Sequence, residues 1–165
     1  MRRIRFFVSM GLVILLLALA SPVIARSKPK HTPTRAEVLR YALPNSVLTP
    51  GQVSSSLRES DVCQGEKKGR NQHKGTVLKR YGISPSDAEK YWIDHLVPLE
   101  LGGTSDISNL WPQPIEEEKV KDKLENRLKQ NVCGGSLTLK KAQFLLIQDW
   151  RAAYVKNFID GLSFR

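Results

Sequence analysis

Asp94 and His95 are neighbours in a largely apolar stretch that also contains a Gly-Gly pair and an asparagine. Histidine titrates near neutral pH, so it can take a proton from a water molecule. A carboxylate beside it can bind a divalent cation that keeps open positions for other oxygen ligands. The pair therefore has the groups needed to hydrolyse a phosphodiester, although an isolated Asp-His pair often has no chemical role.

The segment from Tyr91 to Pro114 must position these side chains. Its apolar residues and the Gly102-Gly103 pair predict two short strands folded back on each other. Asn109 follows His95 by fourteen residues and would begin the second strand. Residues 114–132 predict one long helix, with proline and three glutamates at its positive N-terminal end.

The motif residues are Asp94-His95, Pro98, Gly102-Gly103 and Asn109-Leu110. This pattern resembles the HNH endonuclease signature of the ββα-metal fold. The chain is also similar to a group of small exported bacterial HNH-like proteins in the segments Asp94–Gly103, Asn109–Pro114, Lys121–Asn126 and Val132–Gly134. The resemblance implies a small α+β fold, with a ββα-metal hairpin-plus-helix core flanked by additional helices.

The resemblance also implies roles for individual residues. Asp94 would bind the metal, His95 would be the general base, and Asn109 would tie the second strand to the loop and hold the histidine. The family's last ligand is a His or Asn on the helix, but Glu118 stands there, with Asp122 one turn later. Carboxylates suit Mg²⁺ or Mn²⁺, with Zn²⁺ or Ni²⁺ as alternatives, so the site is carboxylate-rich, weak or lost.

The N-terminus predicts export. Three arginines precede an apolar run, and Val23-Ile24-Ala25 gives a small-residue pattern that predicts signal-peptide cleavage after Ala25. The apolar run is short for a membrane span, although an uncleaved anchor remains the alternative. We expect a secreted or periplasmic protein with no stable membrane span after cleavage.

Three segments are expected: a signal peptide (1–25), a basic flexible leader with a short helix (26–44), and the HNH-like domain (45–165). Thr34 and Glu37 form a capping-box pattern for the short helix. Further helices are predicted over residues 75–81, 84–91 and 139–158, the last capped by Thr138.

The formal charge is +10, and removal of residues 1–25, which hold three arginines and no acid, lowers it to +7. A basic domain favours polyanionic partners, here DNA or RNA. Candidate phosphate contacts are Lys121, Arg127, Lys67, Lys68 and Arg70. The same charges are also compatible with a solvated helix face and a solvated loop.

Cys63 and Cys133 are the two cysteines of the chain. In an oxidising compartment they predict one intramolecular disulfide. Closing a loop of about 70 residues would stabilise the fold by about 4 kcal/mol in the chain-entropy model. The absence of a nearby histidine argues against a cysteine-ligated structural zinc.

Together these features predict an exported, metal-dependent HNH-like endonuclease that hydrolyses nucleic-acid phosphodiester bonds. The alternative is a catalytically degenerate module that binds nucleic acid or a cell-envelope partner. A third hypothesis is a structural envelope protein. With no repeats or heptads, the sequence leaves the oligomeric state open.

Overall fold

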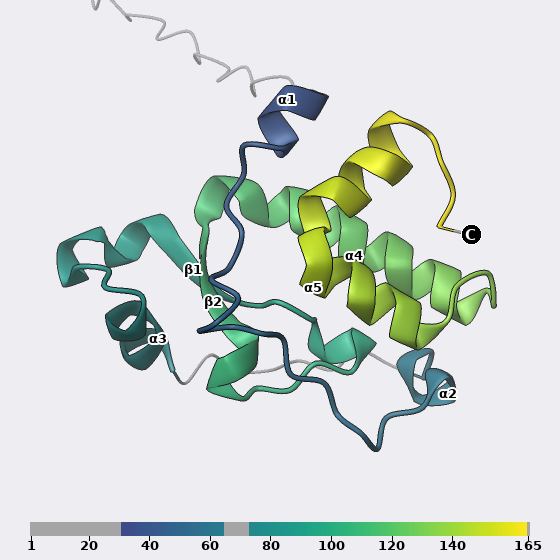
Figure 1. Cartoon of the computed structure of the whole chain (residues 1–165), viewed down its shortest axis with the longest axis horizontal. Helices are drawn as coiled ribbons and strands as arrows, with labels where there is room; N and C mark the ends of the chain where they lie inside the picture. The colour runs from purple at the N-terminus through teal and green to yellow at the C-terminus, as the bar shows by residue number, and fades with distance from the viewer. Residues whose placement is uncertain (1–30, 65–72, 165) are drawn as a thin grey trace, which may run out of the picture. The chain divides into compact units, whose positions relative to one another are not determined.

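The computed structural model describes residues 31–64 and 73–164, and the predicted signal peptide lies outside this part. It is a mixed α+β structure whose sheet, within the described residues, has two antiparallel strands (Figure 1). The helices and strands in chain order are α1 (Arg35–Val38), α2 (Glu59–Val62), α3 (Lys74–Arg80), η1 (Pro85–Lys90), β1 (Tyr91–His95), η2 (Leu99–Leu101), η3 (Ile107–Asn109), β2 (Leu110–Pro114), η4 (Ile115–Glu117), α4 (Glu118–Cys133), α5 (Leu139–Tyr154) and η5 (Val155–Ile159).

The predicted helix starts are confirmed where a side chain caps the first turn. Thr34 and Glu37 form the reciprocal capping box of α1. Thr138 accepts a hydrogen bond from the backbone N–H of Lys141 at the start of α5. Ser84 caps η1, which is a 3₁₀ helix with Pro85 in its first turn. These caps join residues two or three positions apart, so the local sequence determines them.

The long predicted helix over residues 114–132 begins later than expected. Pro114 is the last residue of β2, and Ile115–Glu117 forms a 3₁₀ turn before α4 starts at Glu118. The carboxylate of Glu117 is buried and accepts two contacts from the backbone N–H of Ala42. Glu117, one of the three glutamates predicted at the start of this helix, thus holds the segment that follows α1.

The last helix ends earlier than predicted. α5 stops at Tyr154, and a π-helical turn, η5, follows it. Asp149 has an extended backbone inside α5, and its carboxylate accepts hydrogen bonds from the backbone N–H groups of Arg151 and Ala152. The helix is therefore interrupted there and capped a second time by Asp149.

Two apolar clusters hold the elements together. The larger one joins α2, α4, α5 and η5, and Figure 1 shows α4 and α5 side by side. The smaller cluster joins α3 to one face of the hairpin through Val77, Leu78, Ile93 and Leu110. The hairpin therefore packs against α3 on that face. Trp111 of β2 lies on the opposite face of the hairpin and is also buried.

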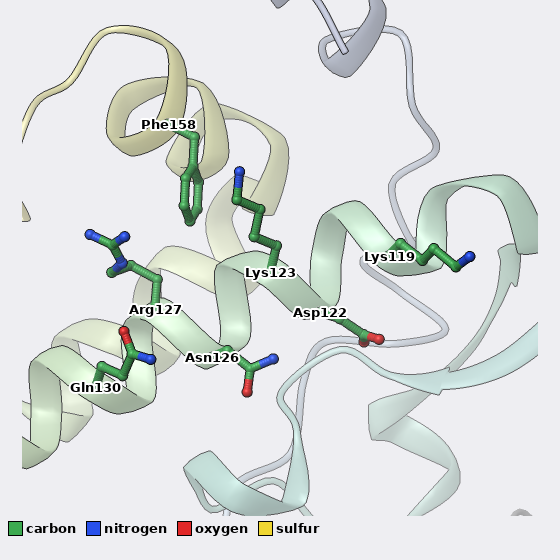
Figure 2. A pocket seen from close by; sticks show the side chains of 7 residues that line it. All are labelled: Lys119, Asp122, Lys123, Asn126, Arg127, Gln130 and Phe158. Carbon is green, nitrogen blue, oxygen red and sulfur yellow. The ribbon is translucent and has the colours of Figure 1, made fainter. Parts of the chain in front are cut away.

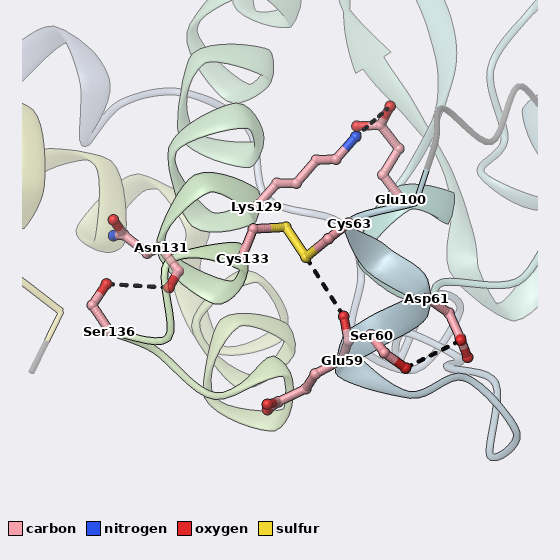
Figure 3. The surroundings of a disulfide bond; sticks show 9 residues. All are labelled: Glu59, Ser60, Asp61, Cys63, Glu100, Lys129, Asn131, Cys133 and Ser136. Atoms are coloured by element: carbon pink, nitrogen blue, oxygen red, sulfur yellow. Dashed lines mark hydrogen bonds and ion pairs between the residues drawn. A yellow bond between two sulfur atoms is a disulfide. The ribbon is translucent and has the colours of Figure 1, made fainter.

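The predicted disulfide is confirmed. Cys63, directly after α2, is bonded to Cys133, the last residue of α4, with 5.6 Å between their Cα atoms (Figure 3). Beside it, Lys129 of α4 lies 3.5 Å from the carboxylate of Glu100 in η2. The disulfide fits a protein from an oxidising compartment. Within the described residues, no helix is long and apolar enough to cross a membrane.

Candidate functional site

The hairpin register separates Asp94 from His95. Asp94 lies opposite Trp111, and His95 lies opposite Leu110. Because successive strand side chains point to opposite faces, His95 is on the face that packs against α3, and Asp94 is on the face toward α4. The two neighbours in sequence thus meet different surroundings.

Asn109 fixes the loop that joins the two strands. Its side chain is fully buried; the Oδ1 atom accepts a hydrogen bond from the Val97 N–H at 3.0 Å. The Nδ2 atom donates to the carbonyls of Val97 at 2.9 Å and Thr104 at 2.8 Å. Its own carbonyl accepts from the N–H of Leu96. Asn109 therefore makes the tie between loop and second strand that the resemblance implied.

The Gly-Gly pair permits this close packing. Gly102 adopts a left-handed conformation, with φ of 85°, at the end of η2. A Cβ on Gly103 would lie 1.8 Å from the carbonyl oxygen of Val97 and 2.8 Å from Nδ2 of Asn109. Any side chain at Gly103 would therefore displace the loop immediately after His95.

His95 is partly buried at the end of β1, and its Nε2 atom lies 3.4 Å from the hydroxyl of Ser105. Burial lowers the pKa of His95 below its usual value near 6.5; Asp94 opposes this effect, and Lys121 adds to it. The imidazole is therefore neutral at neutral pH. A neutral imidazole can accept a proton, which is the property that a general base requires.

Lys121 was expected on a solvated helix face, but it is buried, with only 1% of its surface exposed. Its Nζ atom donates to Oδ2 of Asp94 at 2.7 Å, to the carbonyl of His95 at 2.8 Å, and to Oε1 of Glu125. An ammonium has three N–H donors, and here all three have oxygen partners. Lys121 thus links α4 to the end of β1 and is shielded from any phosphate at the surface.

The position of Lys121 follows from the buried stripe of α4. That stripe consists of Lys121, Leu124, Leu128 and Val132, which recur at helical spacing. The apolar residues alone predict a stripe of Val120, Leu124 and Leu128, which does not include Lys121. The signal for Lys121 is its place one turn before Leu124, together with an acid, Glu125, four residues later.

Within the ion-paired cluster, the pKa values of Lys121 and Glu125 are shifted. Burial disfavours the charged form of Lys121, but the attraction of Asp94 and Glu125 outweighs burial and raises its pKa. Burial raises the pKa of Glu125 to about 7, although Lys121 pulls it in the opposite direction. Lys121 therefore stays a cation at neutral pH.

The predicted metal ligands Asp94, Glu118 and Asp122 do not form a three-ligand group. Among residues 31–64 and 73–164, no three His, Cys, Asp or Glu side chains lie close enough together to share a metal ion. Asp94 is bonded to Lys121 instead. Burial raises the pKa of Asp122, and the negative charges of Asp94 and Glu118 add to this rise. Because Asp94 is occupied by Lys121 in this arrangement, a divalent ion on this acid stays a prediction.

A basic groove runs along the exposed side of α4. It is a hollow of about 390 Å³ lined by Lys119, Asp122, Lys123, Asn126, Arg127, Gln130 and Phe158 (Figure 2). The Lys123 ammonium lies 4.3 Å and the Arg127 guanidinium 5.3 Å from the Phe158 ring centre, so both cations flank the ring. Arg127 is therefore placed where a phosphate can reach it.

The remaining predicted phosphate contacts, Lys67, Lys68 and Arg70, lie outside the described residues. Within the described part, the fold brings Asp94, Lys121 and Glu125 into one ion-paired cluster in which Lys121 is buried. It leaves His95 on the other face of β1 and Arg127 in the groove. Glu125 was missed as a site residue, and its only sequence signal is the four-residue spacing from Lys121.

Comparisons of the chain with protein-family models, with curated proteins and with solved structures found no match. The resemblance to HNH nucleases therefore stays a prediction from the motif residues of the sequence.

Proposed function

We propose that this chain is an exported HNH-like endonuclease that hydrolyses phosphodiester bonds of DNA or RNA outside the cytoplasm. Its ββα core would consist of β1, β2 and α4. The observation that carries the proposal is the position of His95 at the end of β1, partly buried and beside a loop held by Asn109. The disulfide and the basic charge of the chain agree with an exported protein that binds a polyanion.

In this proposal His95 takes a proton from a water molecule as that water attacks the phosphorus atom. The bond from phosphorus to the leaving oxygen breaks, and that oxygen takes a proton from solvent. The side chains of Lys119, Lys123 and Arg127 would hold flanking phosphates along α4. No step is assigned to a divalent ion, because the expected ligands do not form a group that fits one.

Cleavage of plasmid DNA and of RNA by the oxidised mature chain, residues 26–165, tests the catalytic part. Reactions with Mg²⁺, Mn²⁺, Ni²⁺, Zn²⁺ or EDTA would be run beside His95→Gln. We expect this variant to lose about 100-fold or more in rate, as is typical when a general base is removed. His73→Gln, which changes the exposed histidine just before α3, is the matched control and should retain the rate. Equal rates for both variants would contradict the assignment of His95.

Binding to a short DNA duplex at several salt concentrations tests the groove. Replacing both Lys123 and Arg127 by Gln should reduce the slope of log affinity against log salt by about 2, which corresponds to two lost phosphate contacts. Lys140→Gln, on the exposed side of α5 and outside this groove, should change the slope by less than half as much. An unchanged slope in the double variant would place nucleic acid elsewhere.

The second candidate function is a binding module without catalysis, with nucleic acid or a cell-envelope partner as its ligand. The ion pair between Asp94 and Lys121 favours it, because this acid is occupied within the protein. Salt-dependent DNA binding together with no cleavage under any of the five conditions would support this candidate. Metal-dependent or metal-free cleavage that disappears in His95→Gln would rule it out.

A further inference from the structure

The ammonium of Lys121 is bonded to Asp94, one of the three acids that the sequence pattern predicts as ligands of a divalent cation. It contacts a carboxylate oxygen of Asp94, the carbonyl of His95 and a carboxylate oxygen of Glu125. All three partners are oxygens, which are also the atoms that Mg²⁺ and Mn²⁺ bind. The cluster thus has the ligand chemistry of a hard-cation site, with a side chain of this protein as the cation.

We propose that Lys121 is the resident cation of this site and takes the place of a divalent metal on Asp94. The inference rests on the proposed nuclease function and replaces its metal requirement: hydrolysis would proceed without added divalent ions. Lys121 is a positioning residue, because with 1% exposure it cannot touch a substrate. It acts by orienting Asp94 and by holding the backbone carbonyl of His95.

Lys121 can stay charged in its buried position only because nearby oxygen atoms balance its positive charge. A buried ammonium is costly unless opposite charges and hydrogen bonds replace its water, and here two carboxylates and one carbonyl do so. An apolar residue at this point of the buried stripe of α4 would pack beside Leu124 without that cost. A charge at this position therefore indicates a role beyond packing.

A divalent ion would compete directly with this ammonium. Oxygen ligands bind Mg²⁺ or Mn²⁺ at about 2.0 to 2.6 Å, whereas Oδ2 of Asp94 already has Nζ of Lys121 at 2.7 Å. A metal on that oxygen would stand close to a fixed like charge with little water between them. Glu125, the other acid of the cluster, is bonded to the same ammonium.

Manganese titration followed by NMR line broadening tests the proposal without any need for activity. For the wild-type chain we expect no selective broadening at Asp94 and His95 up to about 1 mM Mn²⁺. In Lys121→Met the two carboxylates lose their cation, so selective broadening should appear at a Mn²⁺ concentration at least about tenfold lower. Lys140→Met, with the same charge change on the exposed side of α5 and outside the groove, is the matched control and should show the wild-type response to Mn²⁺.

Selective broadening at Asp94 in the wild-type chain, removed by Asp94→Asn, would overturn the inference, and this comparison does not depend on whether Lys121→Met folds. A folded Lys121→Met that gains no Mn²⁺ binding would overturn it as well. Cleavage in EDTA at a rate within about threefold of that in Mg²⁺ is the expected kinetic result. If no condition gives cleavage, the nuclease proposal fails, while the Mn²⁺ titration still decides whether Lys121 excludes the metal.

Discussion

Asn109→Ala should unfold the loop that supports His95. The change removes three buried hydrogen bonds, one from the Val97 N–H and two to the carbonyls of Val97 and Thr104. Each bond contributes about 1 kcal/mol, and each buried group left unpaired costs more. We therefore expect the free energy of unfolding to fall by about 3 to 5 kcal/mol, which is a large fraction of the stability of an ordinary domain.

Urea denaturation of the oxidised mature chain at neutral pH measures this loss. Asn126→Ala is the matched control, because Asn126 is exposed on α4, and its effect should stay within about 0.5 kcal/mol. Asn109→Asp should be at least as damaging as the alanine variant, since an oxygen would then face the two carbonyls that Nδ2 now serves. A loss below about 1 kcal/mol for Asn109→Ala would refute the proposed loop tie.

Three further predictions concern the fold and the candidate base. Gly103→Ala should cost more than about 3 kcal/mol in urea denaturation, because its Cβ would lie 1.8 Å from a carbonyl oxygen; Gly75→Ala, with no atom within 4 Å, should cost nothing. Reducing the Cys63–Cys133 disulfide, which spans 70 residues, should lower the free energy of unfolding by about 4 kcal/mol; an unchanged urea midpoint would contradict this. The NMR titration midpoint of His95 should lie below 6.5, because burial lowers the pKa of the folded state. The contribution of neutral His95 to the free energy of unfolding is therefore fully present above pH 6.5, and it is lost as the pH falls through the folded pKa. His95→Gln should weaken that acid sensitivity, and a midpoint above 6.5 would exclude the burial effect.

The sequence predicted the elements whose hydrogen bonds join near neighbours. The capping box of Thr34 and Glu37, the Thr138 cap and the Gly102 turn all appear where the local pattern places them. The hairpin and the helix after it also appear, and the two cysteines form their predicted bond. Local backbone preferences specify the caps and the turn, apolar spacing predicts the strands and the helix, and the expected oxidising compartment predicts the disulfide.

The pattern failed at two polar residues whose carboxylates bind backbone N–H groups. Asp149 interrupts α5 and caps its second half, although the apolar stripe predicted an unbroken helix. Glu117 accepts a hydrogen bond from the backbone of Ala42, 75 residues away. An apolar periodicity marks which residues are buried, but it does not show which polar groups are buried with them.

The sequence by itself determined the motif of Asp94, His95 and Asn109, the hairpin that carries it, and the basic charge of the chain. Only the tertiary structure decided the partner of Asp94, because Lys121 lies 27 residues away and reaches it across the packing of α4 on β1. Strand alternation sends Asp94 toward α4 and His95 toward α3, and the buried stripe of α4 brings an ammonium to that acid. A buried charge requires a counter-charge, and the folded arrangement of these elements decides which one it meets.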